Sequence, residues 1–209
     1  MKHQFNRTFI AALSLIAAIT VAAAFSVRST IVARADAHPA LVAANAAAAA
    51  AAPEVGATAP DFRLPYATQE KIFLSPADQL ALSGQRGKAV ILAFYPADWS
   101  GGCTKEVCTL RDTFAELAKL NAVVLGISGD YVFSHQEWAK FHKLQFPLLS
   151  DHDHKIARMY GVYDEPSGFN KRSVFLIDKA GVIRYTNLAF KAGDKADYNS
   201  LRTELEKLK

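Results

Sequence analysis

Two apolar runs flank a helix-length segment, and this arrangement constrains the fold most. The runs are residues 88–95 (KAVILAFY), apolar after the lysine, and residues 122–127 (AVVLGI). Strands that are apolar at successive positions are buried on both faces, as in sheets covered by helices. Between the runs, apolar residues recur with the period of a helix over residues 102–120. The order predicts a covered α/β sheet whose central strands are joined by a helix.

The rest of the chain adds elements around this pair. A capping-box pattern at residues 134–137 (SHQE) predicts the start of a helix that runs to about residue 144. The other predictions are a strand at 146–149, a short helix at 155–160, a β-hairpin of 172–178 and 182–187, and a final helix at 194–208. This pattern predicts a mixed central sheet with helices on both faces, for which a thioredoxin-like α/β fold is the simplest match.

The first 37 residues predict export. Lys2 and Arg7 precede an uncharged, mostly apolar run of 17 residues, and residues 35–37 (ADA) resemble a signal-peptide cleavage site. The run is at the short end of what can span a bilayer, so both a cleaved signal peptide and an uncleaved inner-membrane anchor are expected alternatives. Either one places the rest of the chain in the periplasm or another extracytoplasmic space. Residues 38–53 are then an alanine-rich linker, and residues 54–209 are the folded domain.

The net charge of +4 is mostly a property of this leader. Four basic residues and one acidic residue precede Pro53, which leaves 20 basic and 19 acidic residues in the rest of the chain. The sequence there shows no cluster of lysine and arginine of the kind that binds nucleic acid. Nucleic acid is therefore excluded as a partner.

The two cysteines of the chain, Cys103 and Cys108, lie at the start of the predicted 102–120 helix. Five residues of α-helix separate two Cα atoms by about 8–9 Å, whereas a disulfide requires less than about 7 Å. The cysteines can therefore bond only if the first turns unwind. Cys103 lies on the apolar face in the first turn, where free N–H groups and the helix dipole favour a thiolate. Cys108 lies on a more polar face.

The cysteine pair has three alternative roles: a static disulfide, a metal site and a thiol–disulfide exchange or copper-delivery site. Exported proteins often carry static disulfides, but a permanent bridge at this spacing would disrupt the helix. Two cysteines are a weak zinc signal, and His152 and His154 are interpreted as part of a polar turn that caps the next helix. A thiol–disulfide oxidoreductase would have Cys-x-x-Cys, and a copper-delivery protein Cys-x-x-x-Cys with a distal histidine. No metal or cofactor is expected.

Residues 96–103 (PADWSGGC) fit the peroxiredoxin pattern Pro-x-x-x-Thr/Ser-x-x-Cys. The second cysteine, five positions later, makes the segment similar to the bacterioferritin-comigratory-protein (PrxQ-type) branch of this AhpC/TSA-like family. Segments 55–64, 146–151 and 172–178 also resemble the family, so the resemblance covers about residues 54–209. Ser100 stands where threonine is commoner, and Gly101 stands where this branch often has proline.

The resemblance implies a thiol-dependent peroxidase. Cys103 would be the peroxidatic thiolate, which attacks hydrogen peroxide or an organic hydroperoxide and becomes a sulfenic acid. Cys108 would then form an intramolecular disulfide with Cys103. Ser100 would bind the peroxide oxygens, and Pro96 would shield the pocket. Arg172 would stabilise the thiolate and the charge that develops on the peroxide.

The chain is expected to be a monomer, and the resemblance implies reduction by a thioredoxin-like or other thiol reductant. The export segment leaves that reductant open, because thioredoxin is cytosolic. Glu106 follows Cys103 by one helical turn and is expected to be an exposed carboxylate that complements the helix dipole. The alternative function is an exported thioredoxin-fold thiol–disulfide oxidoreductase without peroxidase activity.

Overall fold

The computed structural model describes residues 51–208. Its helices are α2 (Gly101–Lys119), α3 (Val132–His142), α4 (Lys155–Met159) and α5 (Lys195–Glu206), with a 3-10 turn at Ser83–Gln85. Its longer strands are β5 (Ala89–Phe94), β6 (Ala122–Ser128), β7 (Leu148–Ser150), β10 (Ser173–Ile177) and β11 (Ile183–Asn187). The short strands are β1 (Arg63–Leu64), β2 (Tyr66–Ala67), β3 (Ile72–Phe73), β4 (Leu80–Ala81), β8 (Tyr163–Asp164) and β9 (Phe169–Asn170).

Seven of these strands form the central sheet, in the order β11-β10-β5-β6-β7-β2-β3. The three middle strands β5, β6 and β7 are parallel. On one side β10 pairs antiparallel with β5, and on the other β2 pairs antiparallel with β7. The hairpin predicted near the end of the chain is the antiparallel pair β10 and β11. The predicted mixed sheet and thioredoxin-like fold class are confirmed.

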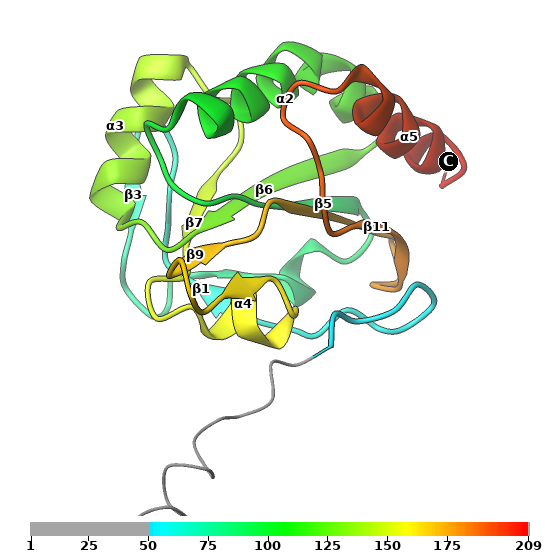
Figure 1. Ribbon diagram of the computed structural model, residues 1–209, viewed down its shortest axis with the longest axis horizontal. Helices are drawn as coiled ribbons and strands as arrows, with labels where there is room; N and C mark the ends of the chain where they lie inside the picture. Colours follow the sequence, from blue (N-terminus) through cyan, green and yellow to red (C-terminus); the bar gives the residue numbers. More distant parts are fainter. Residues whose placement is uncertain (1–50, 209) are drawn as a thin grey trace, which may run out of the picture.

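Helices cover both faces of the sheet (Figure 1), and each face has its own core. Under α2, α3 and α5, β5 contributes Ile91 and Tyr95 to the first core, which also contains Cys103. On the face of α4, the alternate β5 residues Leu92 and Phe94 enter the second core. All six residues of β5 are buried. The uninterrupted apolar run therefore reflects a strand that supplies two cores at once.

One prediction about a helix start is wrong. Helix α3 has Tyr131 as its N-cap without a side-chain cap, and the Ser134 hydroxyl instead donates to Asp98 Oδ2 at 2.7 Å. The predicted capping box fails because a tertiary contact takes its serine. The polar turn predicted before α4 does cap that helix: the Asp151 carboxylate accepts hydrogen bonds from the backbone N–H groups of residues 156 and 157, and Asp153 Oδ1 accepts one from the Lys155 N–H. The His154 side chain makes no cap.

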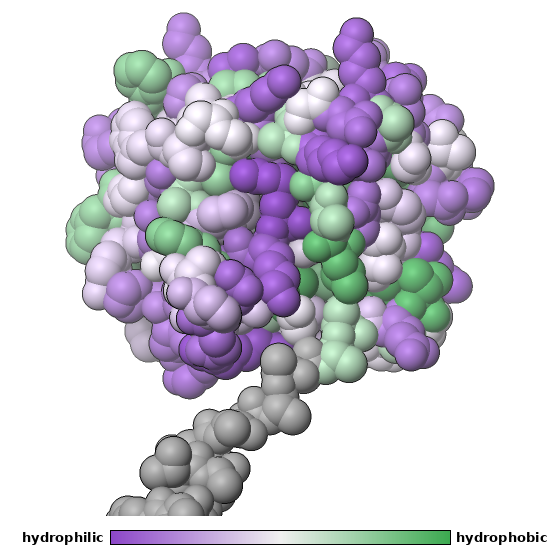
Figure 2. All heavy atoms as spheres, viewed as in Figure 1, coloured by the Kyte–Doolittle hydropathy of each residue, from purple (hydrophilic) through white to green (hydrophobic). Residues whose placement is uncertain are grey.

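The surface of the domain is mostly polar. On the face shown in Figure 2, hydrophilic residues are widespread, and apolar residues lie among them in small groups. Along residues 51–208, no helix has both the length and the apolar character needed to cross a membrane. The predicted signal peptide or anchor at residues 1–37, and almost all of the linker at 38–53, lie outside the described residues.

Candidate active site

Cys103 is positioned by the N-terminus of α2, which follows β5 after a short loop. Ser100 is the N-cap of the helix, and its Oγ accepts a hydrogen bond from the Cys103 backbone N–H at 3.4 Å and donates one to Ala97 O at 3.2 Å. Cys103 is completely buried. It lies in the first turn of α2, at the positive end of the helix dipole.

Arg172 brings a guanidinium group to this sulfur. It directly precedes β10, whose first residue, Ser173, pairs with Phe94 at the end of β5. Arg172 Nη2 donates to Cys103 Sγ at 3.3 Å. Burial opposes the charged form of Arg172, but Glu106 and the Cys103 sulfur raise its pKa. The site thus holds a fixed cation in hydrogen-bond contact with the buried sulfur.

Glu106 is fully buried, so the expectation of an exposed carboxylate is wrong. It lies three residues after Cys103, on the same side of α2, and its Oε2 forms an ion pair with Arg172 Nη1. Burial raises the pKa of Glu106 to about 7, although Arg172 acts to lower it. The other oxygen, Oε1, has no hydrogen-bond partner among the described residues. The i, i+3 spacing from Cys103 was the available sequence signal for this placement.

Gly102 leaves space for the guanidinium group. A Cβ at this position would lie 3.2 Å from Arg172 Nη2, which is tighter than ordinary packing. At Gly101 a Cβ would meet nothing within 4 Å. The close approach of Arg172 therefore requires the second glycine of the pair, while the first is free to vary.

Cys108 lies on a different side of α2 from Cys103. Both cysteines are free thiols in one uninterrupted helix, and Cys108 is half-buried. Its Sγ faces α3 and lies 3.6 Å from His142 Nδ1. The structure thus brings Cys103, Ser100 and Arg172 together and keeps Cys108 apart from them. Pro96 is half-buried, two residues beyond the end of β5.

A buried polar network holds the loop that precedes Cys103. Asp98 Oδ2 lies 2.9 Å from His135 Nδ1, and both side chains are fully buried. Asp98 Oδ1 accepts a hydrogen bond from Tyr95 OH at 2.8 Å, and His135 Nε2 lies 3.2 Å from Leu149 O. The two ring nitrogens of His135 thus face the Asp98 carboxylate and a backbone carbonyl oxygen. Sequence reasoning missed this pair because its members are 37 residues apart.

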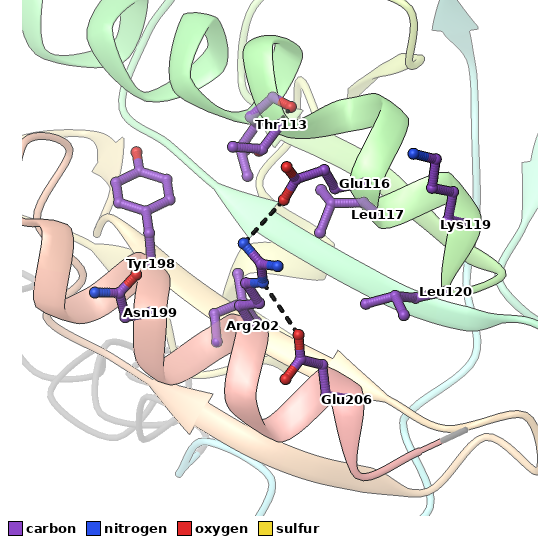
Figure 3. Close-up of a pocket in the computed structure, with 11 residues that line it drawn as sticks. Thr113, Glu116, Leu117, Lys119, Leu120, Tyr198, Asn199, Arg202 and Glu206 are labelled. Carbon is purple, nitrogen blue, oxygen red and sulfur yellow. Dashed lines mark hydrogen bonds and ion pairs between the residues drawn. The ribbon is translucent and has the colours of Figure 1, made fainter.

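One groove of the domain lies away from the Cys103 thiol. A cavity of about 450 Å³ lies between the C-terminal half of α2 and α5 (Figure 3), and its lining on α2 starts at Leu110, two turns beyond Cys103. Arg202 crosses it, with ion pairs to Glu116 at 2.9 Å and to Glu206 at 3.1 Å. In the part of the chain from 51 to 208, no group of three or more His, Cys, Asp or Glu residues is placed to hold a metal ion.

Comparisons with known proteins give consistent matches. The model of the AhpC/TSA family matches residues 55–186. Peroxiredoxin Bcp of Bacillus subtilis is 38% identical over 134 residues, which are 61% of this chain and 80% of the relative. Thioredoxin peroxidase of Fasciola hepatica is 36% identical over 132 residues, 60% of this chain and 68% of the relative. The crystal structure of peroxidoxin BcpB from Mycobacterium tuberculosis superposes with a TM-score of 0.65 at 30% identity, covering 75% of this chain and 98% of that one.

Proposed function

We propose, from the premise that this chain belongs to the AhpC/TSA family and is a thiol-dependent peroxidase of the Bcp type, that Cys103 is the peroxidatic cysteine and Cys108 the resolving cysteine. The observation that supports this most is the buried Cys103 sulfur at a helix N-terminus, 3.3 Å from Arg172 Nη2. A helix N-terminus and an adjacent cation are the surroundings that make a cysteine nucleophilic.

In the first step, the Cys103 thiolate attacks one oxygen of the hydroperoxide. A sulfur–oxygen bond forms, the O–O bond breaks, and the leaving oxygen takes a proton to become water or an alcohol. Arg172 stabilises the negative charge that moves from the sulfur to the leaving oxygen. The Ser100 hydroxyl, which is bound to Cys103 N–H and Ala97 O, exchanges to the peroxide oxygens, and Pro96 limits the access of water.

In the second step, Cys108 attacks the sulfenic acid on Cys103 and releases water. The two positions are too far apart in the intact α2 for a disulfide, so the first turns of the helix must unwind. A thiol reductant then restores both thiols. A thioredoxin-like protein is the proposed donor, which agrees with the name of the Fasciola hepatica relative.

Thiol counting tests this assignment. One equivalent of hydrogen peroxide added to the reduced protein is expected to remove two free thiols and to lower the mass by 2 Da, as an intramolecular disulfide does. Cys108→Ser should lose one thiol and retain a sulfenic acid, whereas Cys103→Ser should react only slowly. The assignment is wrong if Cys103→Ser consumes peroxide as fast as the wild type. If peroxide leaves both thiols unchanged, the chain is instead a thiol–disulfide oxidoreductase or a static domain.

We propose further that the domain works as a monomer outside the cytoplasm. Support for a place outside the cytoplasm comes from the charged start and the apolar run of the leader. Full-length protein expressed with its leader is expected in the periplasmic or membrane fraction. Mass spectrometry then distinguishes a leader removed after Ala37 from a retained anchor that resists alkaline extraction. Recovery of the uncleaved chain in the cytoplasmic fraction would contradict export.

A further inference from the structure

We propose that His142 is a further catalytic residue, whose Nδ1 takes the proton of the Cys108 thiol in the resolving step. This inference rests on the proposed function, because it assigns a base to the step that forms the disulfide. His142 is the last residue of α3, and Cys108 lies in the second turn of α2, 34 positions earlier in the chain. Only the packing of the two helices brings them together.

The geometry suits proton transfer. Cys108 Sγ and His142 Nδ1 are 3.6 Å apart, which is within the range of a hydrogen bond that involves sulfur. Both side chains are half-buried, so water competes less for the contact than at a fully exposed site. A neutral imidazole has one nitrogen that accepts a proton, and here Nδ1 faces the thiol.

The imidazole ring is held in this orientation by aromatic neighbours. The rings of Phe141, Trp138 and Trp99 lie with their centroids 4.9, 5.8 and 6.5 Å from that of His142. Arg111, three residues after Cys108, donates from Nη1 to the His142 carbonyl oxygen at 2.8 Å. This bond ties the end of α3 to the turn of α2 that follows Cys108. The sulfur and the ring are therefore placed against each other while α2 is folded.

The charged surroundings favour the form of His142 that accepts a proton. Burial and the nearby Arg111 lower the pKa of His142 below its ordinary value of 6.5, which favours the neutral ring. From α2, Cys108 and Arg111 face the ring, and Arg111 is itself bound to Asp112 at 2.8 Å. From the loop before α2 the neighbour is the uncharged Trp99. No carboxylate contacts the ring among the described residues.

The resolving step then balances as follows. The Cys108 S–H bond breaks, and its proton goes to His142 Nδ1. As the first turns of α2 unwind, the Cys108 thiolate moves away from His142 and attacks the sulfenic sulfur of Cys103. An S–S bond forms, the S–O bond breaks, and the hydroxide that leaves is protonated to water as the imidazolium returns its proton to the solvent. One sulfenic acid and one thiol thus yield one disulfide and one water.

The test separates the two steps of the reaction. Reduced wild-type protein, His142→Asn and His142→Gln are mixed with hydrogen peroxide between pH 5.5 and 9, quenched with acid, and analysed by mass spectrometry for sulfenic acid and disulfide. His152→Asn is the matched control, because His152 stacks on Tyr131 and contacts neither cysteine. We expect both His142 variants to form sulfenic acid at a rate within twofold of the wild type.

Disulfide formation should differ in rate and in pH profile. At pH 7 it is expected to be about 100-fold or more slower in both His142 variants, as for loss of a general base. The variant rates should continue to rise up to pH 9, whereas the wild type and His152→Asn should level off once His142 is neutral. A wild-type rate and profile in the variants would overturn the inference. An equal slowing at every pH would also overturn it, because packing alone would then explain the contact. A wild type that forms sulfenic acid but no disulfide would overturn the proposed resolving step as well.

Discussion

Replacement of Arg172 by methionine is expected to slow the reaction of Cys103 with hydrogen peroxide about 100-fold or more. Arg172 Nη2 contacts the Cys103 sulfur at 3.3 Å, and loss of one donor that stabilises transition-state charge costs about 100- to 1000-fold. Stopped-flow measurement of the second-order rate constant checks this. Arg172→Lys should fall between methionine and the wild type, because it keeps the charge but cannot contact Cys103 and Glu106 with two separate nitrogens.

Two controls distinguish the guanidinium from its surroundings. Arg184→Met removes an arginine from the same hairpin, where Arg184 pairs with Asp178 at 2.6 Å, and should leave the rate constant unchanged. The double variant Arg172→Met with Glu106→Gln removes the carboxylate that methionine leaves unpaired. If the double variant reacts as fast as the wild type, the slow reaction of Arg172→Met came from the unpaired carboxylate of Glu106, and the proposed role of Arg172 is wrong.

Replacement of Glu106 by glutamine is expected to change how stability depends on pH. The pKa of Glu106 in the folded protein is about 7, against a reference of 4.5. Between these values the folded state binds more protons than the unfolded state, so the free energy of unfolding falls as pH rises. At about 1.4 kcal/mol per pH unit, the wild type should lose about 3 kcal/mol relative to Glu106→Gln between pH 4.5 and 7.5. Below pH 4.5 this penalty is absent.

Urea unfolding at several pH values measures this difference. The matched control is Glu116→Gln, which lies on the same helix but is exposed and pairs with Arg202. It should keep the wild-type dependence on pH. If the difference in unfolding free energy between wild type and Glu106→Gln is constant over this range, Glu106 does not titrate there, and the raised pKa is refuted.

Much of the fold followed from local patterns. The two apolar runs, the amphipathic segment between them and the pattern of the last hairpin specify elements through the contacts of near neighbours in the chain. The capping box at Ser134 failed because its hydroxyl binds Asp98, which is 36 residues away. Similarly, Asp98 and His135 form a buried pair that neither residue indicates alone. Single-residue signals at helix ends fail where a tertiary contact takes the same polar group.

The sequence likewise indicated some residues of the candidate site and not others. The pattern around Cys103 and the family resemblance were sufficient to single out Pro96, Ser100, Cys103, Cys108 and Arg172. They were insufficient to predict that Glu106 is buried. A glutamate in the first turns of a helix is stable in water, and its burial here depends on the ion pair with Arg172. Arg172 directly precedes β10, and the antiparallel pairing of β10 with β5 places it at the start of α2.

The sequence by itself determined the fold class and the position of both cysteines on one helix, because both depend on the spacing of residues along the chain. Only the tertiary structure decided the electrostatic surroundings of each sulfur. Arg172 and Glu106 meet at Cys103, and His142 meets Cys108. These contacts join residues 34 to 69 positions apart. Charge and proton transfer depend on distances of a few ångströms in space, which the packing of strands and helices sets.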